Sequence, residues 1–488
     1  MALWAFDNSL TRALAGFYKP WQAASPRDPR IVLFNDALAA RLGLPGRDAG
    51  EEVLAGWLSG RDAVPGSEPV ALAYAGHQFG QFNPQLGDGR ALLLGEVLAP
   101  DGLRFDLQFK GSGATPFSRG ADGKCTLAAA LREYLMSEAM AALGVPTTRS
   151  LAVVATGEGI WRETPHPGAV LTRVAASHLR VGSFEWAAAH KGREAVERLA
   201  DYALERHFPE RMHEANRPLA LLDAVSEVQA RLVARWMALG FVHGVMNTDN
   251  VAISGETIDY GPCAFLDAYA DRQVFSSIDR GGRYAYGQQP AVCRWNLYRL
   301  ASALIEAIAE VDQADTEQAR LLLEAWPARY EAHWLKEMRA KLGLGEEHEG
   351  DLALARDLFT AIEGQQADFS NLFRALSAAL KGGYAVLGDQ LTDPEALRGW
   401  FARWQARLAA EPRDLAERKA AMDAVNPLVI PRNHLTDETL AQAEAGELAP
   451  FLALLDAVTR PFEIRAEFER FTQGPPQGSP AHVTYCGT

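Results

Sequence analysis

The sequence predicts an α+β protein with two lobes: a β-rich N-terminal lobe that carries one inserted helix, and a mostly helical C-terminal lobe. Two strand patterns flank the turn Pro100-Asp101-Gly102, and a helical pattern follows at residues 126–143. Beyond about residue 185 the apolar spacing is helical in most segments. Strands followed by helices, instead of alternating with them, are typical of α+β proteins.

The two strand patterns cover Arg90 to Leu98 and Arg104 to Gly111 and predict a β-hairpin. In the second strand apolar residues alternate with polar ones, so the two sets point to opposite faces of the sheet. Lys110 belongs to the polar set. We therefore expect its side chain to leave the apolar face and to lie in a cleft or in solvent.

The helical pattern at 126–143 stops before Gly144 and Pro146, both of which commonly end helices. Two more strand patterns follow, at 151–157 and 168–175. The inserted helix is therefore expected between two pairs of strands.

In the second half, a helix with an apolar face is expected to end at Gly240. Further helices are predicted at roughly 293–310, 316–342, 395–410 and 437–458. These patterns divide the chain into a β-rich N-lobe with its N-terminal segment, a helical C-lobe, and a C-terminal helical extension with a loose tail, at 1–185, 186–400 and 401–488.

The segment directly after Gly240 contains the strongest functional signal. Protein kinases use a catalytic loop H-R-D-x-x-x-x-N and a later D-F-G. Here His243 and Asn250 keep the spacing of the loop, and Asp259-Tyr260-Gly261 follows, but the base position holds Val245. An aspartate, Asp249, precedes the asparagine instead. The chain is thus expected to have a two-lobed protein-kinase-like fold, and either to bind nucleotide without catalysis or to carry out another reaction on it.

Residues 251–258 predict a β-hairpin around Gly255-Glu256. The two ends of a hairpin lie close together, so the amide oxygen of Asn250 and the carboxylate of Asp259 are expected to share one Mg²⁺ or Mn²⁺ ion. The alternative is a loop of Asx turns, because residues 247–250 are all turn formers. That alternative explains the composition but not the spacing between His243 and Asn250.

Several residues are candidates for binding phosphates. Lys110 and Glu133 are expected to form the strand-lysine and helix-glutamate pair of kinases, with Glu138 as second choice. These glutamates lie about 140° apart around a helix, so at most one of them faces the lysine. Arg173 and Arg180 flank a short loop and are suited to gripping a triphosphate.

Short glycine-containing loops complete the candidate nucleotide site. The turn Gly87-Asp88-Gly89-Arg90 is expected to bring backbone amides and an arginine to anionic oxygens, and Asp122-Gly123 belongs to a second such loop. Taken alone, each is more often an ordinary turn. His77 and His178 are expected to pack or to form hydrogen bonds rather than to bind metal.

Composition restricts the possible partners. The 488 residues are 48% hydrophobic and carry a net charge of −14, which speaks against nucleic acid or a membrane surface as a partner. No apolar stretch has the length of a membrane span, and the N-terminus lacks the pattern of a signal peptide. The four cysteines show no C-x-x-C spacing. A cytoplasmic location is expected.

Taken together, the motifs resemble the selenoprotein O family of pseudokinase-like protein adenylyltransferases, with its bacterial YdiU-type group. The segments that carry this resemblance are FDNS (6–9), YAGHQFGQFNPQLGDGRA (74–91), LQFKGSGATPFSRGADGK (107–124), LREYLMSEAM (131–140), GVPTTRSL (144–151), LTRVAASHLRVGSFE (171–185), HGVMNTDN (243–250), DYGP (259–262), GRYAYGQQP (282–290) and NPLVIPRNH (426–434). They are distributed over nearly the whole chain.

The resemblance implies a kinase-like fold that holds ATP in a flipped orientation and transfers AMP to Ser, Thr or Tyr hydroxyls of proteins, with UMP transfer from UTP as a secondary possibility. It implies that Asp249 accepts the proton and that Asn250 and Asp259 bind Mg²⁺ or Mn²⁺. The residues that it assigns to the nucleotide are Gly87, Gly89, Arg90, Lys110, Asp122, Gly123, Glu133, Arg173, Arg180 and Asp259. Pyrophosphate would be the leaving group, and cations around it would stabilise its charge.

Two other functions remain possible at this point. A phosphotransferase of the aminoglycoside or choline kinase type needs an aspartate where Val245 stands. An inert nucleotide-binding pseudokinase would not need Asp249.

The C-terminus carries one family feature. Cys486 is third from the end, where some members have selenocysteine, and in some members a cysteine there pairs with one downstream of the D-Y-G segment. The corresponding position here is Phe275, so the resemblance does not carry a redox latch over to this chain. A bond between Cys263 and Cys486 remains a hypothesis.

Overall fold

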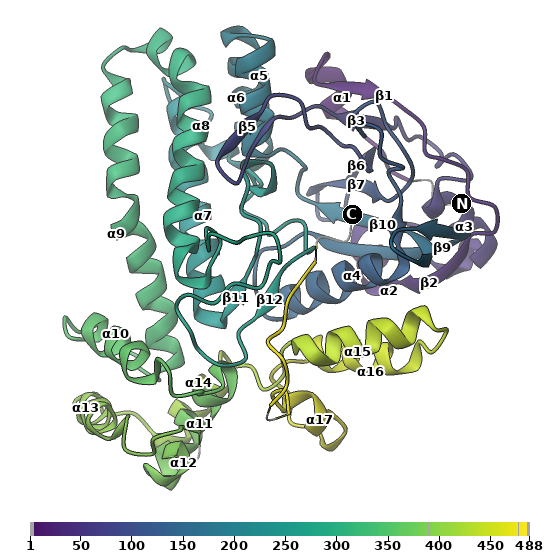
Figure 1. Ribbon diagram of the computed structural model, residues 1–488. Helices are drawn as coiled ribbons and strands as arrows, with labels where there is room; N and C mark the ends of the chain where they lie inside the picture. Colours follow the sequence, from purple (N-terminus) through teal and green to yellow (C-terminus); the bar gives the residue numbers. More distant parts are fainter. Residues whose placement is uncertain (1–3, 389, 477, 486–488) are drawn as a thin grey trace.

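The computed structural model describes residues 4–388, 390–476 and 478–485, and its N-terminal part is built around an antiparallel sheet (Figure 1). The strand order is β1-β3-β6-β7-β10-β9-β2, and β8 pairs with β10 beside this path. The strands are β1 (Tyr18–Pro20), β2 (Arg30–Phe34), β3 (Val70–Leu72), β6 (Ala91–Leu98), β7 (Arg104–Lys110), β8 (Cys125–Thr126), β9 (Arg149–Trp161) and β10 (Pro165–Ala175).

The predicted hairpin is confirmed as β6 and β7, which pair from Ala91 opposite Lys110 to Leu98 opposite Arg104. On its other side β7 pairs with β10, where Leu171 lies opposite Lys110. Lys110 is therefore in the middle of the sheet and buried. Its side chain lies in a cleft and not in solvent.

The inserted helix is α4 (Leu127–Ala142), and it begins where the sequence pattern indicates. Thr126 is the N-cap, because its side chain accepts a hydrogen bond from the amide of Ala129. The helix packs on β9 and β10 with an almost completely buried surface. Near the N-terminal end of the chain, α1 (Ser9–Ala13), α2 (Asp36–Leu42) and α3 (Glu51–Ser59) complete the N-lobe.

The rest of the chain is mostly helical, with α7, α8 and α9 side by side in Figure 1. Its helices are α5 (Val181–His190), α6 (Arg193–His207), α7 (Arg217–Leu239), α8 (Gln289–Val311), α9 (Asp315–Lys341), α10 (Asp351–Ile362), α11 (Phe369–Gly382), α12 (Ala385–Gly388), α13 (Arg398–Ala409), α14 (Leu415–Asp423), α15 (Asn433–Glu444), α16 (Ala449–Val458) and α17 (Glu469–Thr472). Two short pairs, β4 (Gly76–Gln78) with β5 (Gln81–Asn83) and β11 (Phe241–Val242) with β12 (Ala264–Phe265), lie outside the main sheet. The two-lobed α+β prediction is confirmed.

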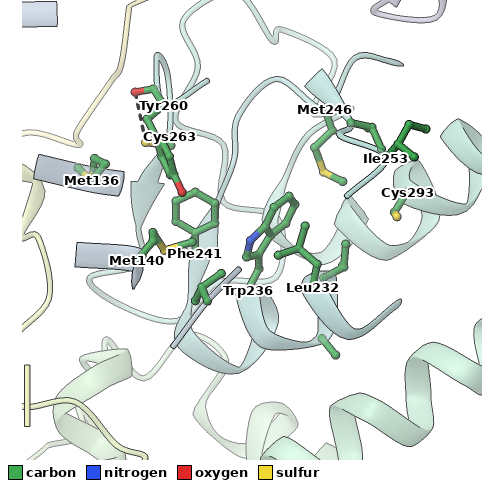
Figure 2. Close-up of a cluster of buried hydrophobic side chains, with 14 of the residues drawn as sticks. Met136, Met140, Leu232, Trp236, Phe241, Met246, Ile253, Tyr260, Cys263 and Cys293 are labelled. Atoms are coloured by element: carbon green, nitrogen blue, oxygen red, sulfur yellow. Dashed lines mark hydrogen bonds between the residues drawn. The ribbon is translucent and has the colours of Figure 1, made fainter. Parts of the chain in front are cut away.

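Helix α7 ends as predicted at Gly240, which takes a left-handed conformation with φ of 72°. The chain then continues into β11 and into the segment 243–250, which we call the active-site loop because it carries the kinase-like motif. Trp236 packs against Phe241 with ring centroids 5.5 Å apart, and Phe241 also contacts Tyr260 (Figure 2). The active-site loop and the Asp259-Tyr260-Gly261 segment thus pack on the same buried apolar cluster.

Two predictions about elements were wrong. The helix expected at 437–458 is two helices, α15 and α16, because the turn between them contains Gly446 with φ of 96°. Residues 251–258 do not form a hairpin: Ala252 bridges to Arg180, whereas Thr257 bridges to Thr147. Neighbouring segments take the hydrogen bonds that a hairpin would use internally.

Helices α15 and α16 pack on the side of α4 that faces away from the sheet (Figure 1). Leu131 and Leu135 of α4 share a buried cluster with Leu440, Phe451 and Leu454. The expected divisions at 185/186 and 400/401 fall inside α5 and α13, and as domain boundaries they stay predictions. Within the described residues, every helix is too short or too polar to cross a membrane.

Candidate active site

A cavity of about 740 Å³ lies between the sheet and the active-site loop. This volume is in the range of small-molecule sites. Every residue that the sequence analysis assigned to the nucleotide, metal or proton lines it: Gly87, Gly89, Arg90, Lys110, Asp122, Gly123, Glu133, Arg173, Arg180, Asp249, Asn250 and Asp259. The fold thus brings together residues that are up to 172 positions apart, from 87 to 259.

Lys110 is the centre of an ion-pair cluster. Its Nζ donates to Glu133 Oε2 at 2.5 Å and to Asp259 Oδ1 at 2.8 Å. Arg173 donates to Glu133 Oε1 from Nε at 2.7 Å, and its Nη2 lies 3.9 Å from Asp259 Oδ1. The first choice of glutamate, Glu133, thus faces the lysine, whereas Glu138 accepts from Arg149.

This cluster keeps its carboxylates ionised. Burial by itself would raise the pKa of Asp259, but the charges of Lys110, Arg90 and Arg173 outweigh it and hold the pKa well below its usual range. The pKa of Glu133 is lowered in the same way, with Arg173 and Lys110 outweighing burial. Both side chains therefore carry negative charge at neutral pH.

Asn250 and Asp259 are suited to a metal ion. The side-chain amide of Asn250 donates from Nδ2 to the carbonyl of Val245 at 3.1 Å, and this bond orients its amide oxygen. The φ of Asp259 is 68°, an unusual backbone conformation for a non-glycine residue. No group of three or more His, Cys, Asp or Glu side chains in the described parts of the chain forms a metal cluster. An amide, a carboxylate and nucleotide phosphate oxygens are a donor set that Mg²⁺ accepts, because this ion rarely takes an all-protein cage.

Asp249 has different surroundings. The residue is 9% exposed, and its Oδ1 has no hydrogen-bond partner among the described residues. Its Oδ2 accepts a long hydrogen bond of 3.4 Å from Gln78. Burial raises the pKa of Asp249 to about 6, although Arg180 opposes this. A buried oxygen without a partner is costly, and such groups are frequent at sites that bind a substrate.

Gly76 leaves the space that the Asp249 carboxylate occupies. A Cβ at Gly76 would lie 2.5 Å from Asp249 Oδ1, so only glycine fits against the carboxylate there. Gly76 begins β4, and the next residues, His77 and Gln78, bond to Thr248 and Asp249. The β4–β5 hairpin thus packs directly on the active-site loop.

Arg180 is held by the same loop. Its Nη1 donates to the carbonyl of Asp249 at 2.9 Å, and its guanidinium lies 4.4 Å from the ring centroid of Tyr74. The segment before it is anchored by His178, whose amide and Nδ1 both contact Asp106 Oδ2, at 2.8 and 3.0 Å. His178 therefore forms hydrogen bonds, as the sequence analysis expected.

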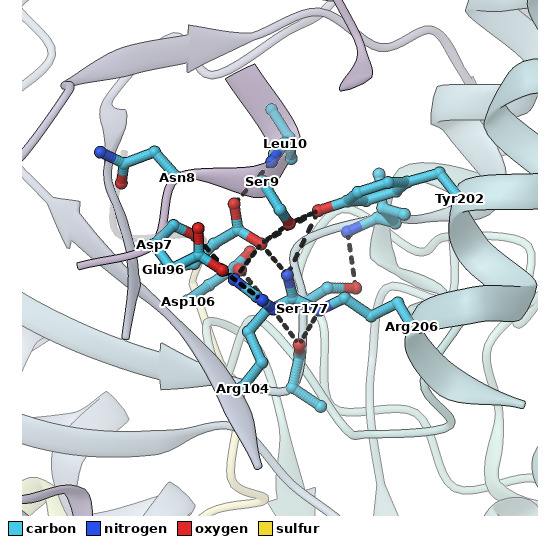
Figure 3. A network of polar contacts seen from close by, with 12 residues as sticks. Asp7, Asn8, Ser9, Leu10, Glu96, Arg104, Asp106, Ser177, Tyr202 and Arg206 are labelled. Atoms are coloured by element: carbon cyan, nitrogen blue, oxygen red, sulfur yellow. Dashed lines mark hydrogen bonds and ion pairs between the residues drawn. The ribbon is translucent and has the colours of Figure 1, made fainter. Parts of the chain in front are cut away.

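Asp106 belongs to a buried polar network that lies between the two lobes (Figure 3). Arg206 of α6 donates to Asp106 at 2.7 Å and also pairs with Glu96 of β6. Glu96 accepts from the amide of Leu10 at 2.6 Å and from Tyr202 at 3.0 Å. Two strand carboxylates and one helix guanidinium thus connect the sheet with the helical lobe.

The glycine turn lies close to the cavity, but its amides are engaged within the protein. Gly87 donates its N–H to Tyr74, Asp88 to Leu72 and Gly89 to Gly87. A Cβ at Gly87 would lie 2.4 Å from the ring of Phe117, so close packing explains this glycine. In this conformation the anionic oxygens expected here would meet the Arg90 side chain rather than these amides.

Asp122 faces the cavity from the other loop. It accepts from Arg162 Nη1 at 2.7 Å and from the amide of Lys124 at 2.9 Å. Gly123 takes a left-handed conformation with φ of 65°, packed against Gly113. These contacts keep the loop folded at the cavity rim.

Sequence reasoning missed Tyr74, Gln78 and Arg132. Arg132 lies beside Glu133 and donates to the carbonyls of Gly261, at 3.0 Å, and Cys263, at 2.6 Å. It therefore positions the segment that follows Asp259. Tyr74 and Gln78 belong to the segment 74–91 that had been noted for resemblance, but no local pattern connects them with Arg180 or Asp249.

The proposed cysteine link falls partly outside the described residues, because Cys486 is one of those not described. Cys263 is buried and free, and burial raises the pKa of its thiol to about 11. Residues 482–485 line the cavity, and the carbonyl of Phe275 accepts from the amide of Thr484 at 2.8 Å. The tail thus runs beside Phe275, and the Cys263–Cys486 bond stays a hypothesis.

The chain is similar to known proteins over nearly its whole length. The sequence model of a family described as "Protein adenylyltransferase SelO" matches residues 2–459. A "Protein nucleotidyltransferase YdiU" of Sphingopyxis alaskensis is 55% identical over 487 residues, which cover 99% of both chains. Proteins of the same description from Cereibacter sphaeroides and Rhodococcus jostii are 54% and 50% identical, covering 99% and 95% of those chains and 99% and 100% of this one.

Proposed function

This chain belongs to the SelO family of protein adenylyltransferases, and from that premise we propose that it transfers AMP from ATP to serine, threonine or tyrosine hydroxyls of proteins. The observation that carries the proposal is that Asp249, whose Oδ1 has no hydrogen-bond partner among the described residues, lines the same cavity as Lys110, Arg173 and Arg180. A base and a set of cations are what attack of a hydroxyl on a phosphate ester requires.

In the proposed reaction the acceptor oxygen forms a bond to the α-phosphorus of ATP while the bond between that phosphorus and the β-phosphate bridge oxygen breaks. Pyrophosphate leaves with the bonding electrons. Asp249 takes the proton of the hydroxyl, and its raised pKa matches this role because the carboxylate is ionised yet basic at neutral pH. The leaving group gains negative charge, which Lys110, Arg173 and Arg180 would stabilise.

Asn250 and Asp259 would hold the divalent ion, either Mg²⁺ or Mn²⁺, and this ion would add positive charge next to the phosphates. Lys110 bonds to Asp259 in the structure, so it would keep that carboxylate oriented while reaching the phosphates. UTP as a second nucleotide and a cytoplasmic location belong to the same proposal and rest on the family resemblance and the sequence.

The other two functions fit the site less well. A phosphotransferase needs a base two residues after His243, and there Val245, a buried side chain without polar atoms, lines the cavity. An inert pseudokinase would have no need for a buried carboxylate with one oxygen unpartnered, because such an oxygen destabilises the fold.

The test is incubation of the protein with Mg²⁺ or Mn²⁺ and ATP that is labelled at either the α- or the γ-phosphate, with a mixture of proteins as acceptors. We expect label on protein from the α position alone, and loss of nearly all of it in Asp249→Asn, which keeps the size of the side chain but removes the base. Label from the γ position alone would establish phosphorylation instead. Absence of both labels would favour the pseudokinase.

A further inference from the structure

A basic and aromatic surface lies beside the active-site loop, where the β4–β5 hairpin meets α8. It consists of His77 and Phe82 on the β4–β5 hairpin together with Arg283, Trp295 and Arg299 around the start of α8, and we call it the acceptor-side surface. The His77 ring lies 4.9 Å from that of Phe82 and 5.3 Å from that of Trp295. The guanidinium carbons of Arg283 and Arg299 lie 4.5 and 5.2 Å from the Trp295 centroid.

This surface is connected directly to the base. The amide of His77 donates to Thr248 Oγ1 at 2.7 Å, and the amide of Phe79 donates to Asn247 Oδ1 at 3.1 Å. Gln78, between them, is the residue that contacts Asp249. Gln78 and Phe79 of this segment line the cavity, so the surface adjoins it.

The α8 side is connected to the same loop. Tyr284, next to Arg283, donates from its hydroxyl to Asn247 at 2.5 Å, and Asn296, next to Trp295, donates to the carbonyl of Met246 at 3.0 Å. The surface therefore has a fixed position relative to the proposed proton acceptor.

Its charges are not balanced within the described residues. Neither Arg283 nor Arg299 forms an ion pair there, and Nε and Nη2 of Arg283 are buried without a hydrogen-bond partner. Glu185 lies beneath the surface, but its oxygens are bonded to His77 and Thr248. Stacking on Trp295 orients the two guanidinium planes, and Arg283 also interacts with the hydroxyl of Tyr284, but neither contact neutralises the positive charges.

Two guanidinium groups without an ion pair among the described residues are notable in a chain with a net charge of −14, and Tyr284, next to Arg283, bonds to the loop that carries Asp249. A planar guanidinium binds a carboxylate through two parallel hydrogen bonds. Phe82, whose exposed fraction is 46%, adds an apolar contact for the backbone or side chains of a bound segment. The acceptor-side surface thus complements an extended, acidic piece of protein.

We propose that the acceptor-side surface binds the protein segment that carries the acceptor hydroxyl, and that it selects segments with an aspartate or glutamate near that hydroxyl. The inference rests on the proposed function, because it needs a protein hydroxyl as acceptor. It adds what the catalytic residues do not supply, a basis for choosing among the many hydroxyls of a protein mixture.

The experiment uses peptide pools with one central serine and with Asp, Asn or Arg placed at each flanking position in turn. The protein transfers label from α-labelled ATP in the presence of Mn²⁺, and kcat/KM is measured for each pool. At one or more positions we expect the Asp pool to exceed the matched Asn pool by about tenfold, mainly through KM, since a charge-assisted hydrogen bond contributes about 1.5–3 kcal/mol. The Arg pool should be poorest.

The variants Arg283→Gln and Arg299→Gln, alone and combined, should bring the ratio of Asp to Asn pools toward one while KM for ATP stays unchanged. Phe82→Ala should raise KM for all pools alike. Arg272→Gln is the matched control. Arg272 is exposed and lies, like Arg283, between β12 and α8, so the variant removes the same charge at a residue that contacts no ring of this surface. If Arg283→Gln lowers the unfolding temperature, its effect on the ratio is set aside, and the ratio of Asp to Asn pools in Arg299→Gln tests the inference.

Equal rates for Asp and Asn pools in the unmodified protein, or a preference that persists in the double variant, would overturn the inference and leave the proposed function intact. Competition by a single-stranded oligonucleotide, with none by poly-glutamate, would overturn it in favour of nucleic acid at this surface. Absence of α-label on every peptide and protein would instead refute the proposed function, and the inference with it.

Discussion

Asp249 and Asp259 line one cavity, but their electrostatic surroundings differ. Burial raises the pKa of Asp249 to about 6, whereas Lys110, Arg90 and Arg173 outweigh burial at Asp259 and lower its pKa. Carboxylates with such opposite environments commonly have separate roles in catalysis. This difference agrees with the roles that we propose, Asp249 as proton acceptor and Asp259 as anionic metal ligand.

Single substitutions in the ion-pair cluster test these roles. Asp259→Ala should abolish transfer, because the metal would lose its anionic ligand. Lys110→Ala should lower kcat/KM about 10²- to 10³-fold through loss of a cation at the phosphates. The measurement is α-label transfer with Mg²⁺ and Mn²⁺, and Lys19→Ala, at an exposed lysine of β1, is the control. Full activity in Asp259→Ala would contradict the metal assignment.

Elements place these residues through a few contacts between loops. The β4–β5 hairpin closes over the active-site loop and brings Gln78 to Asp249. The loop at 251–258 is held by Arg180 on one side and Thr147 on the other. Within it Glu256 accepts from the amide of Ala176 and from Ser254, both at 2.9 Å. This buried carboxyl connects the segment before Arg180 with the one before Asp259.

Glu256 should make stability depend on pH. Burial raises its pKa from 4.5 to about 7, against the hydrogen bonds from Ser254 and Ala176. Between these values the folded state binds more protons than the unfolded state, so its contribution to stability falls as pH rises from about 4.5 to about 7. Glu256→Gln removes this titration and keeps an oxygen acceptor. The free energy of unfolding of the variant, minus that of the native protein, should therefore be roughly 1–3 kcal/mol larger at pH 8 than at pH 5.

The check is the midpoint of thermal unfolding of both proteins at pH 5 and pH 8. Glu52→Gln, at an exposed position of α3, serves as control. A difference between Glu256→Gln and the native protein that does not change with pH would refute the assigned titration.

At the scale of the whole molecule, the two lobes are joined by polar contacts as well as by apolar packing. The network of Glu96, Asp106 and Arg206 runs from the sheet to α6 (Figure 3). Helices α15 and α16 cover α4 from outside, and residues 482–485 return to the cavity (Figure 1). The C-terminal extension thus supports the helix that carries Glu133.

Arg206→Met should destabilise the protein by about 3–5 kcal/mol, because it leaves two buried carboxylates without their guanidinium partner. Transfer activity should fall as well, since Asp106 anchors the segment that carries Arg180. The unfolding midpoint and the kcat/KM for ATP are the measurements. Arg193→Met on the same helix removes only two surface ion pairs, with Glu197 and Glu310, and should change neither by much. An unfolding midpoint as high as that of the control would show that the network does not hold the lobes.

The sequence by itself determined the order of a β-rich part with one inserted helix and a helical part, the end of α7 at Gly240, and Glu133 as first choice for the partner of Lys110. These features depend on local periodicity and on a motif with fixed spacing, and both can be read along the chain. The hairpin expected at 251–258 was wrong because this segment pairs with neighbouring segments instead of with itself. The single helix expected at 437–458 was wrong because a turn divides it into α15 and α16.

Only the tertiary structure decided the state of Asp249, the engagement of the amides at Gly87 to Gly89, and the surface around Trp295. Burial, hydrogen-bond partners and electrostatic fields come from residues that are distant in sequence, such as Gln78 and Asp249 or His77 and Trp295. A motif can therefore identify which chemistry the chain carries, whereas the fold sets how each group is charged and which acceptor can reach it.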